Sequence, residues 1–83
     1  MPLFMDVHVL AIPVRMEDVA RAHLADLRTQ VGRDVRYLRY WLDEDAGRLF
    51  CLVEAPSAGA AADVHRDAHG LVAESIYRVQ EGS

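Results

Sequence analysis

The chain has 83 residues, 52% hydrophobic and 27% charged, which suits one small folded domain and excludes a disordered tail. Its net charge of −4 disfavours a nucleic-acid partner, and its single cysteine, Cys51, excludes an intrachain disulfide framework. No basic signal-peptide segment and no apolar run of membrane-spanning length is present. We therefore expect one cytoplasmic domain over residues 1–83, without nucleic acid or membrane as partners.

The first half of the chain predicts a strand, a helix and a second strand. Residues 3–10 alternate between two faces, as a β-strand does, and Pro13 ends this segment. Residues 16–31 predict a helix that ends at Gly32, although no good N-cap residue precedes it. Its apolar stripe, which we expect to face the core, consists of Met16, Ala20, Leu24, Leu27 and Val31. Residues 35–42 are rich in aromatic and aliphatic side chains, which favours a strand.

The second half predicts a returning strand, a second helix and a last strand. Residues 43–47 form an acidic turn, so residues 49–54 should pair with the preceding strand as a hairpin. Ser57 is the expected N-cap of the second helix, Gly70 closes it, and residues 74–79 form the final strand. This order predicts an α+β ferredoxin-like fold, βαββαβ. Its antiparallel four-stranded sheet would have the order 4-1-3-2, with both helices on one face.

Two histidines one helical turn apart, His65 and His69, carry the main chemical signal. Residues four apart share a helix face, so both imidazoles can reach one metal ion, and imidazole commonly binds zinc, copper and nickel. Alanines surround His65 on the expected inward face and leave room for a ring and an ion. A core histidine beside one that favours the helix C-terminus would explain the same pair without metal. The residues alone leave both interpretations open.

The other two histidines lie on other elements. If His8 in the first strand faces the helices, all four imidazoles can converge, with Cys51 as a neighbour. If it faces the open side of the sheet, His8 and Asp6 form a separate pair. His23 lies at the flank of the first helix's stripe, where a bond to a carboxylate would also account for it.

Five segments resemble those of a family of small nickel-binding proteins with no assigned enzymatic activity. They are Asp6–His8, Ala22–Leu27, Val35–Trp41, Phe50–Pro56 and Val64–Leu71. Together they cover essentially the whole chain in the same order, and the His-x-x-x-His-Gly and Phe-Cys-Leu elements are the most specific. The loop at residues 12–16 lacks the Pro-Gly and Thr cap expected of the family, which concerns the start of the helix. The resemblance implies a ferredoxin-like fold, a homodimer and nickel bound partly through histidine.

The resemblance implies that the metal ligands are among the four histidines His8, His23, His65 and His69. We expect a divalent transition metal, nickel before others, to be held for buffering, sensing or delivery. Whether Asp6, Glu54 or Cys51 joins the ligands, and which sheet face forms the homodimer, stays open. Because imidazole must be neutral to bind a cation and normally titrates near pH 6.5, binding should weaken between about pH 7 and 5.

Two alternatives come from other functional classes. The first is a small-molecule enzyme of the dimeric α+β barrel type, an oxygenase or isomerase. There His8, Tyr40 and His65 would act as a general-base cluster in the cavity between sheet and helices. The second is a plain interaction module whose histidines serve structure only. Added metal would leave the stability of either unchanged, so metal-dependent stability separates both from a metal-binding protein.

Overall fold

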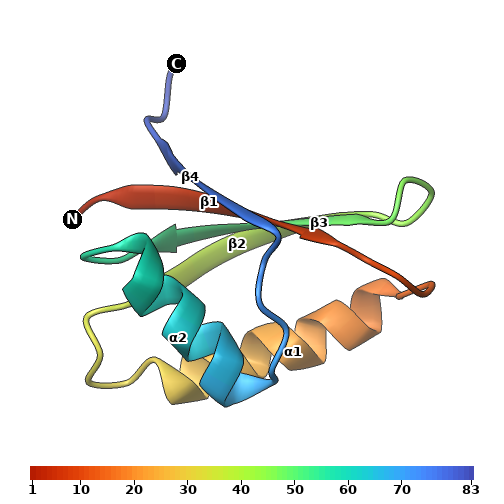
Figure 1. The fold of residues 1–83 in the computed structure, drawn as a ribbon, viewed down its shortest axis with the longest axis horizontal. Helices are drawn as coiled ribbons and strands as arrows, with labels where there is room; N and C mark the ends of the chain where they lie inside the picture. The colour runs from red at the N-terminus through yellow and green to blue at the C-terminus, as the bar shows by residue number, and fades with distance from the viewer.

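The computed structural model describes residues 1–83 and contains a four-stranded sheet with two helices on one of its faces (Figure 1). In chain order, the elements are β1 (Leu3–Val9), α1 (Met16–Thr29), β2 (Arg36–Asp43), β3 (Arg48–Glu54), α2 (Ala58–Ala68) and β4 (Ser75–Val79). All strand pairs are antiparallel and the sheet order is β2-β3-β1-β4, so the predicted ferredoxin-like fold and strand order are confirmed. Neither helix combines the length and hydrophobicity that crossing a bilayer would require.

Both helices begin where short polar contacts satisfy their first backbone N–H groups. The Ser57 hydroxyl accepts a hydrogen bond from the Ala60 N–H at 3.1 Å, which confirms the predicted N-cap of α2. At the start of α1 no capping side chain is available, as expected. The Asp18 carboxylate instead accepts from the Arg15 N–H at 3.1 Å, so half of a capping box fixes the first turn.

The central strands β1 and β3 each turn one buried face toward the helices, and these faces include polar side chains. On β1 the residues turned this way are Phe4, Asp6 and His8, and on β3 they are Leu49, Cys51 and Val53. Strand pairing sets Cys51, Asp6 and Ile76 side by side in one row across the sheet. The Asp6 carboxylate is thus buried in the middle of the helix-covered face. Because burial removes its hydration, it needs hydrogen-bond partners from the helices.

A β-bulge in β2 brings two tyrosines onto that same face. The pairing register shifts between Tyr37 and Arg39, where Leu38 is the extra residue. Tyr37 pairs with Val53 and Tyr40 with Cys51, both of which lie on the helix-covered face. Without the bulge, residues three apart in a strand would point to opposite faces. The bulge therefore delivers both phenol rings to the helix side.

The predicted core stripe of α1 is wrong, because the helix is rotated about its axis. Met16, Leu24, Leu27 and Val31 are 47%, 46%, 36% and 78% exposed. The inward face instead carries Val19, Ala22, His23 and Asp26, of which Val19 and Asp26 are buried. Hydrophobic periodicity assigns an aspartate to the solvent side, but this one has buried partners on α2, and that pairing fixes the rotation of α1.

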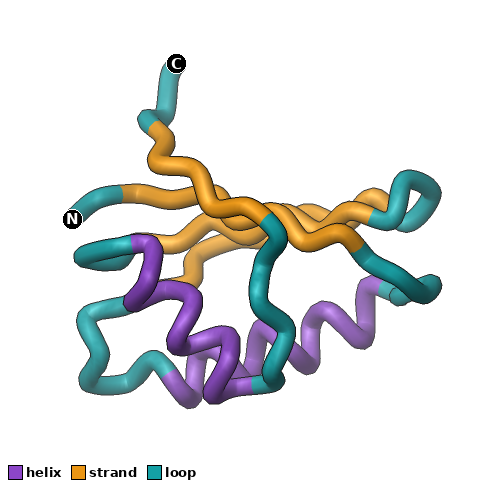
Figure 2. Tube along the Cα trace, viewed as in Figure 1, coloured by secondary structure: helices purple, strands orange, loops and turns teal.

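The two helices are tied to each other and to β4 by loops at one end of the layer. Figure 2 shows the loop that leaves α2 and climbs to β4 at the edge of the sheet. An ion pair between Arg33, just after α1, and Asp67 on α2 spans 2.6 Å. The inward faces of α1 and α2 consequently meet over the centre of the sheet, where the histidines lie.

Candidate metal centre

His65 lies at the centre of a buried cluster, with a carboxylate on each side of its ring. Its Nδ1 is 2.8 Å from Oδ1 of Asp26 on α1, and its Nε2 is 2.9 Å from Oδ2 of Asp6 on β1. The side chain is 2% exposed and belongs to the inward face of α2. Small residues such as Ala61, which is fully buried, let the helix approach closely enough for these contacts. The inward placement predicted for His65 is thereby confirmed.

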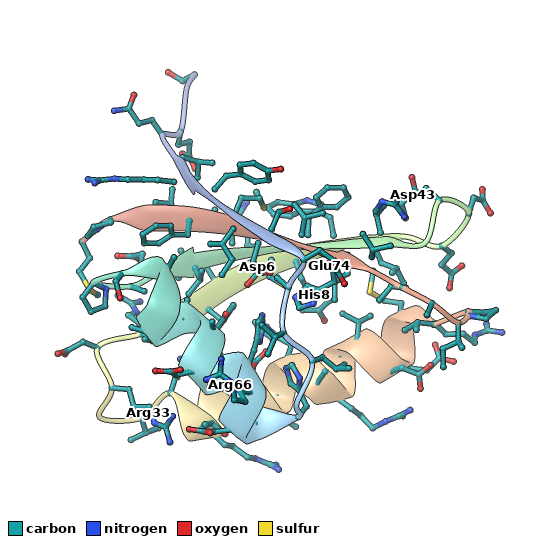
Figure 3. All side chains as sticks on the ribbon, viewed as in Figure 1. Asp6, His8, Arg33, Asp43, Arg66 and Glu74 are labelled. Carbon is teal, nitrogen blue, oxygen red and sulfur yellow. The ribbon has the colours of Figure 1, made fainter.

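Asp6 holds together three side chains from three different elements. Besides His65, its carboxylate accepts from Nε2 of His8 at 3.1 Å and from the Tyr37 hydroxyl at 3.1 Å. The Tyr37 hydroxyl also lies 3.0 Å from the carbonyl oxygen of Ala61. Figure 3 shows Asp6 and His8 projecting from β1 toward the helices. Of the two orientations left open for His8, the structure has the one that faces the helices. The pair with Asp6, which was expected for the other orientation, forms on this face as well.

Asp26 plays the corresponding part on the other side of His65. Its Oδ1 is 3.0 Å from Nε2 of His69, one helical turn beyond His65. Gly70, with φ of +79°, ends α2 and turns the chain so that the Leu71 N–H donates to Nδ1 of His69 at 3.1 Å. Because Nδ1 accepts that bond, the neutral ring carries its proton on Nε2, the nitrogen that lies next to Asp26.

These contacts form a continuous chain of alternating histidines and aspartates. It runs from His69 through Asp26, His65 and Asp6 to His8. Burial alone would lower the pKa of His65, but its hydrogen bonds to Asp26 and Asp6 outweigh burial and raise it to about 9. Burial works in the opposite sense on both aspartates, yet bonds to the histidines hold the pKa of Asp6 and of Asp26 below the usual range. At neutral pH the centre is an imidazolium between two carboxylates.

His23 and Cys51 line the same region without belonging to this chain of bonds. The His23 ring packs against Tyr40 with ring centroids 4.7 Å apart and makes no hydrogen bond to the cluster. Burial lowers the pKa of His23, so its ring is neutral at pH 7. Burial, followed by the charge of Asp6, raises the pKa of the Cys51 thiol far above its usual range. A buried, protonated thiol is a poor nucleophile.

Two sets of side chains place their donor atoms close enough to surround one ion. The first set is Asp6, His8, Cys51 and His65, and the second is Asp26, His65 and His69. Within each set the donor atoms lie within 4.8 Å of one another. Imidazole nitrogen with carboxylate oxygen suits nickel, copper or zinc, so the donors fit the expected metal. Glu54 belongs to neither set, because it alternates with the buried Val53 and faces the open side of the sheet.

His65 is shared by both sets, which restricts how an ion can be held. Both of its nitrogens contact carboxylates, so each carries a proton when the ring is charged. An ion bound to His65 must replace one of these protons, and the displaced carboxylate can then bind the ion itself. A proton and a metal ion would therefore compete for the same nitrogen of His65.

Two members of the site were missed from the sequence. Neither Asp26 on α1 nor Tyr37 on β2 was predicted to belong to it. The signal for Asp26 was weak but present, since Asp26 lies three residues after His23 and thus on the same helix face. For Tyr37 the decisive feature is the bulge, which no spacing in the sequence reveals.

The comparisons with known proteins agree with this geometry. A family described as "Nickel responsive protein SCO4226-like" matches residues 4–79. The chain belongs to this family. Among solved structures, the SCO4226-like chain is similar to the crystal structure of SCO4226 from Streptomyces coelicolor A3(2). The two share 34% sequence identity with a TM-score of 0.89, and the match covers 98% of this chain and 99% of that one. None of the curated proteins matches the chain.

Proposed function

We propose that this protein binds a divalent transition metal, nickel before others, at the Asp/His cluster. The observation that carries the proposal is the convergence of three histidines and two aspartates from three elements, β1, α1 and α2, on one buried point. Buried polar groups in such number are costly unless they serve a purpose, and clusters of this composition are typical of metal sites. The family description, which names a response to nickel, supports the choice of metal. Buffering, sensing or delivery of nickel is the role we infer.

The ion is held through His65 in either donor set. Replacement of His65 by alanine should therefore lower nickel affinity by at least about tenfold, whichever set is used, because a ligand is lost. His8→Ala and His69→Ala separate the sets, since each removes a ligand from only one of them. His23→Ala tests whether the fourth histidine, which lies outside both sets, takes part. Asp63→Asn, an exposed change on the outer face of α2, is the matched control.

Calorimetric titration of nickel into untagged protein measures these affinities directly. Elemental analysis of the same protein, purified without an affinity tag, identifies the metal it carries from the cell. This second measurement is needed because copper binds most nitrogen sites more tightly than nickel does. Unchanged nickel affinity in His65→Ala would contradict the proposal.

Small-molecule chemistry is the second candidate, and one observation favours it. A cavity of about 450 Å³ lies between the sheet and α1 and reaches His8, Tyr40 and His65, the residues of the alternative general-base cluster. An enzyme of this kind would turn over a substrate with those three residues intact and metal removed. A melting temperature that nickel leaves unchanged at pH 7.5 would favour it over the metal-binding function.

A further inference from the structure

The cavity beside the Asp/His cluster is far larger than a metal ion needs. Its volume is about 450 Å³, within the range of pockets that enclose small organic molecules. Twelve of its nineteen lining residues are hydrophobic, among them Val14, Val19, Ala22 and Leu49. An apolar wall adds nothing to the binding of a bare ion, whereas it stabilises an organic ligand by removing apolar surface from water.

The mouth of this cavity is also apolar. Ile12 from the β1–α1 loop is 71% exposed, and Leu71 and Val72 from the α2–β4 loop are 56% and 41% exposed. These three side chains line the cavity from two loops that are far apart in sequence. Solvent-exposed apolar side chains around an apolar cavity are typical of a ligand-binding opening. A hydrophobic ligand body would cover them.

The inner end of the cavity holds a carboxylate oxygen that is free to accept a hydrogen bond. Oδ1 of Asp26 receives both His65 and His69, while its Oδ2 has no partner. Asp26 is only 3% exposed and lines the cavity. Since no fully buried side-chain oxygen in the structure lacks a partner, the unpartnered Oδ2 is not completely enclosed by protein. A hydrogen-bond donor with a positive charge fits this atom best.

The remaining charges of the lining favour the same kind of ligand. Glu74, just before β4, lines the cavity together with His8 on β1, and both are labelled in Figure 3. No lysine or arginine lines it. Both ring nitrogens of His65 already lie within hydrogen-bond distance of Asp26 and Asp6, so the ring has no free nitrogen for a ligand. A carboxylate or phosphate head group would find only the uncharged donors of Tyr40 and His23, beside the carboxylates of Asp26 and Glu74.

We propose that this cavity binds a small organic cation, a primary amine with an apolar body, whose ammonium group donates to Oδ2 of Asp26. The apolar body lies against Val19, Ala22 and Leu49 and reaches the exposed side chains at the mouth. This proposal goes beyond metal binding and does not depend on it, because it uses Oδ2 of Asp26, whereas His65 and His69 lie against Oδ1.

The test compares three probes of equal chain length, namely hexylamine, hexanol and hexanoate, by calorimetric titration into metal-free full-length protein. Hexylamine should bind at least tenfold more tightly than the alcohol or the acid. Equal binding of all three would overturn the proposal by showing a cavity that selects only for apolar surface. No binding of hexylamine would overturn it as well.

Two matched variants of α1 locate the probe. Ala22→Leu adds volume inside the cavity without removing any member of the cluster and should lower hexylamine affinity at least tenfold. Ala20→Leu makes the same change on the exposed outer face of the helix and should leave the affinity unchanged. Hexylamine affinity that survives Ala22→Leu would overturn the assignment to this cavity. Nickel titrations of both variants separate this result from the metal site, since neither change removes a metal donor.

Discussion

His65 is a buried charge that its neighbours make stable. Its ring lies between Asp6 and Asp26, and the Tyr37 ring packs on it with centroids 4.2 Å apart at an angle of 30°. Buried ion pairs contribute little net stability compared with apolar packing, but breaking one leaves an unpaired buried charge. In this protein the imidazolium separates two carboxylates that would otherwise repel each other across the core.

Removal of that ring should therefore be among the most destabilising single changes in the chain. For His65→Ala we expect a loss of about 3–5 kcal/mol in the free energy of unfolding, because two buried carboxylates lose their common partner. His23→Ala is the matched control, and should cost only about 1 kcal/mol because His23 has ring packing but no hydrogen bond to the cluster. Urea unfolding of metal-free protein measures both. Similar losses for the two variants would contradict the role given to His65.

The raised pKa of His65 also predicts how stability depends on pH. Because its pKa of about 9 in the folded state lies above the unfolded value of 6.5, its contribution is complete below pH 6.5 and disappears as the pH rises through 9. Metal-free protein should thus lose roughly 2–3 kcal/mol of unfolding free energy between pH 6.5 and 9. Asp6 and Asp26 act in the opposite sense, since their lowered pKa values give stability above about pH 4 that is lost in acid. Urea unfolding at a series of pH values checks this, and a flat profile from pH 6.5 to 9 would refute it.

The same pKa revises the expected pH dependence of nickel binding. An ordinary histidine would make binding weaken only below pH 7, but His65 still holds its proton there. Nickel affinity should keep rising between pH 7 and 9, and binding at pH 7.5 should release a proton. Titrations in buffers of different ionisation enthalpy measure that release.

At the level of whole elements, the C-terminus of α2 is what orients His69. Gly70 adopts a left-handed conformation, and its N–H bonds to the carbonyl oxygens of His65 and Arg66 at 3.0 and 3.1 Å. This turn brings the next N–H group, that of Leu71, onto Nδ1 of His69. Because the cap occupies Nδ1, it is Nε2 of His69 that lies next to Asp26. The end of α2 therefore fixes the orientation of a side chain in the site.

A pair of glycine substitutions in or just after α2 tests this role. Gly70→Ala should cost about 1 kcal/mol, because φ of +79° is unfavourable for any residue with a Cβ. Gly59→Ala, in the first turn of the same helix, should stabilise by up to about 1 kcal/mol, since its backbone is helical and a Cβ finds only Ser57 Oγ at 3.9 Å. Thermal unfolding compares the two. Equal effects of the same sign would show that the turn at Gly70 is not a constraint.

For the molecule as a whole, the two sheet faces differ in what covers them. The helices cover the face with the polar cluster, whereas the other face carries a row of apolar side chains. Trp41 and Tyr77 there are 45% and 57% exposed, and Phe50 and Leu52 lie between them in the sheet. A small sheet with apolar residues on both faces needs a second cover. We propose that a second copy of the chain supplies it, as the family resemblance implies.

Sedimentation at micromolar concentration tests the homodimer. The wild-type protein should run at twice the mass of the 9.3 kDa chain. Trp41→Arg should produce monomers by placing a charge in the apolar face. The control, Leu24→Arg, places the same charge on the outer face of α1 at an equally exposed position, 46% against 45%, and should leave the dimer intact. A wild-type monomer, or dimers in both variants, would refute this interface.

The element order, the strand order and two of the histidines could be read from local patterns. Alternation marks strands, Ser57 and Gly70 mark the ends of α2, and four-residue spacing places His65 and His69 on one face of a helix. These features depend on neighbours in the chain, so the sequence determines them. The rotation of α1 does not, because apolar periodicity pointed to Leu24 and Leu27, whereas the helix turns Asp26 inward.

That difference has a physical cause. A carboxylate is excluded from a core unless a partner offsets its lost hydration, and the partners of Asp26 lie 39 and 43 residues further along the chain. In the same way, Tyr37 reaches Asp6 only because a bulge in β2 changes the alternation of that strand. Local sequence thus determined the six elements and their order. The ion pairs and the bulge, which exist only once distant segments meet, determined which residues form the buried centre.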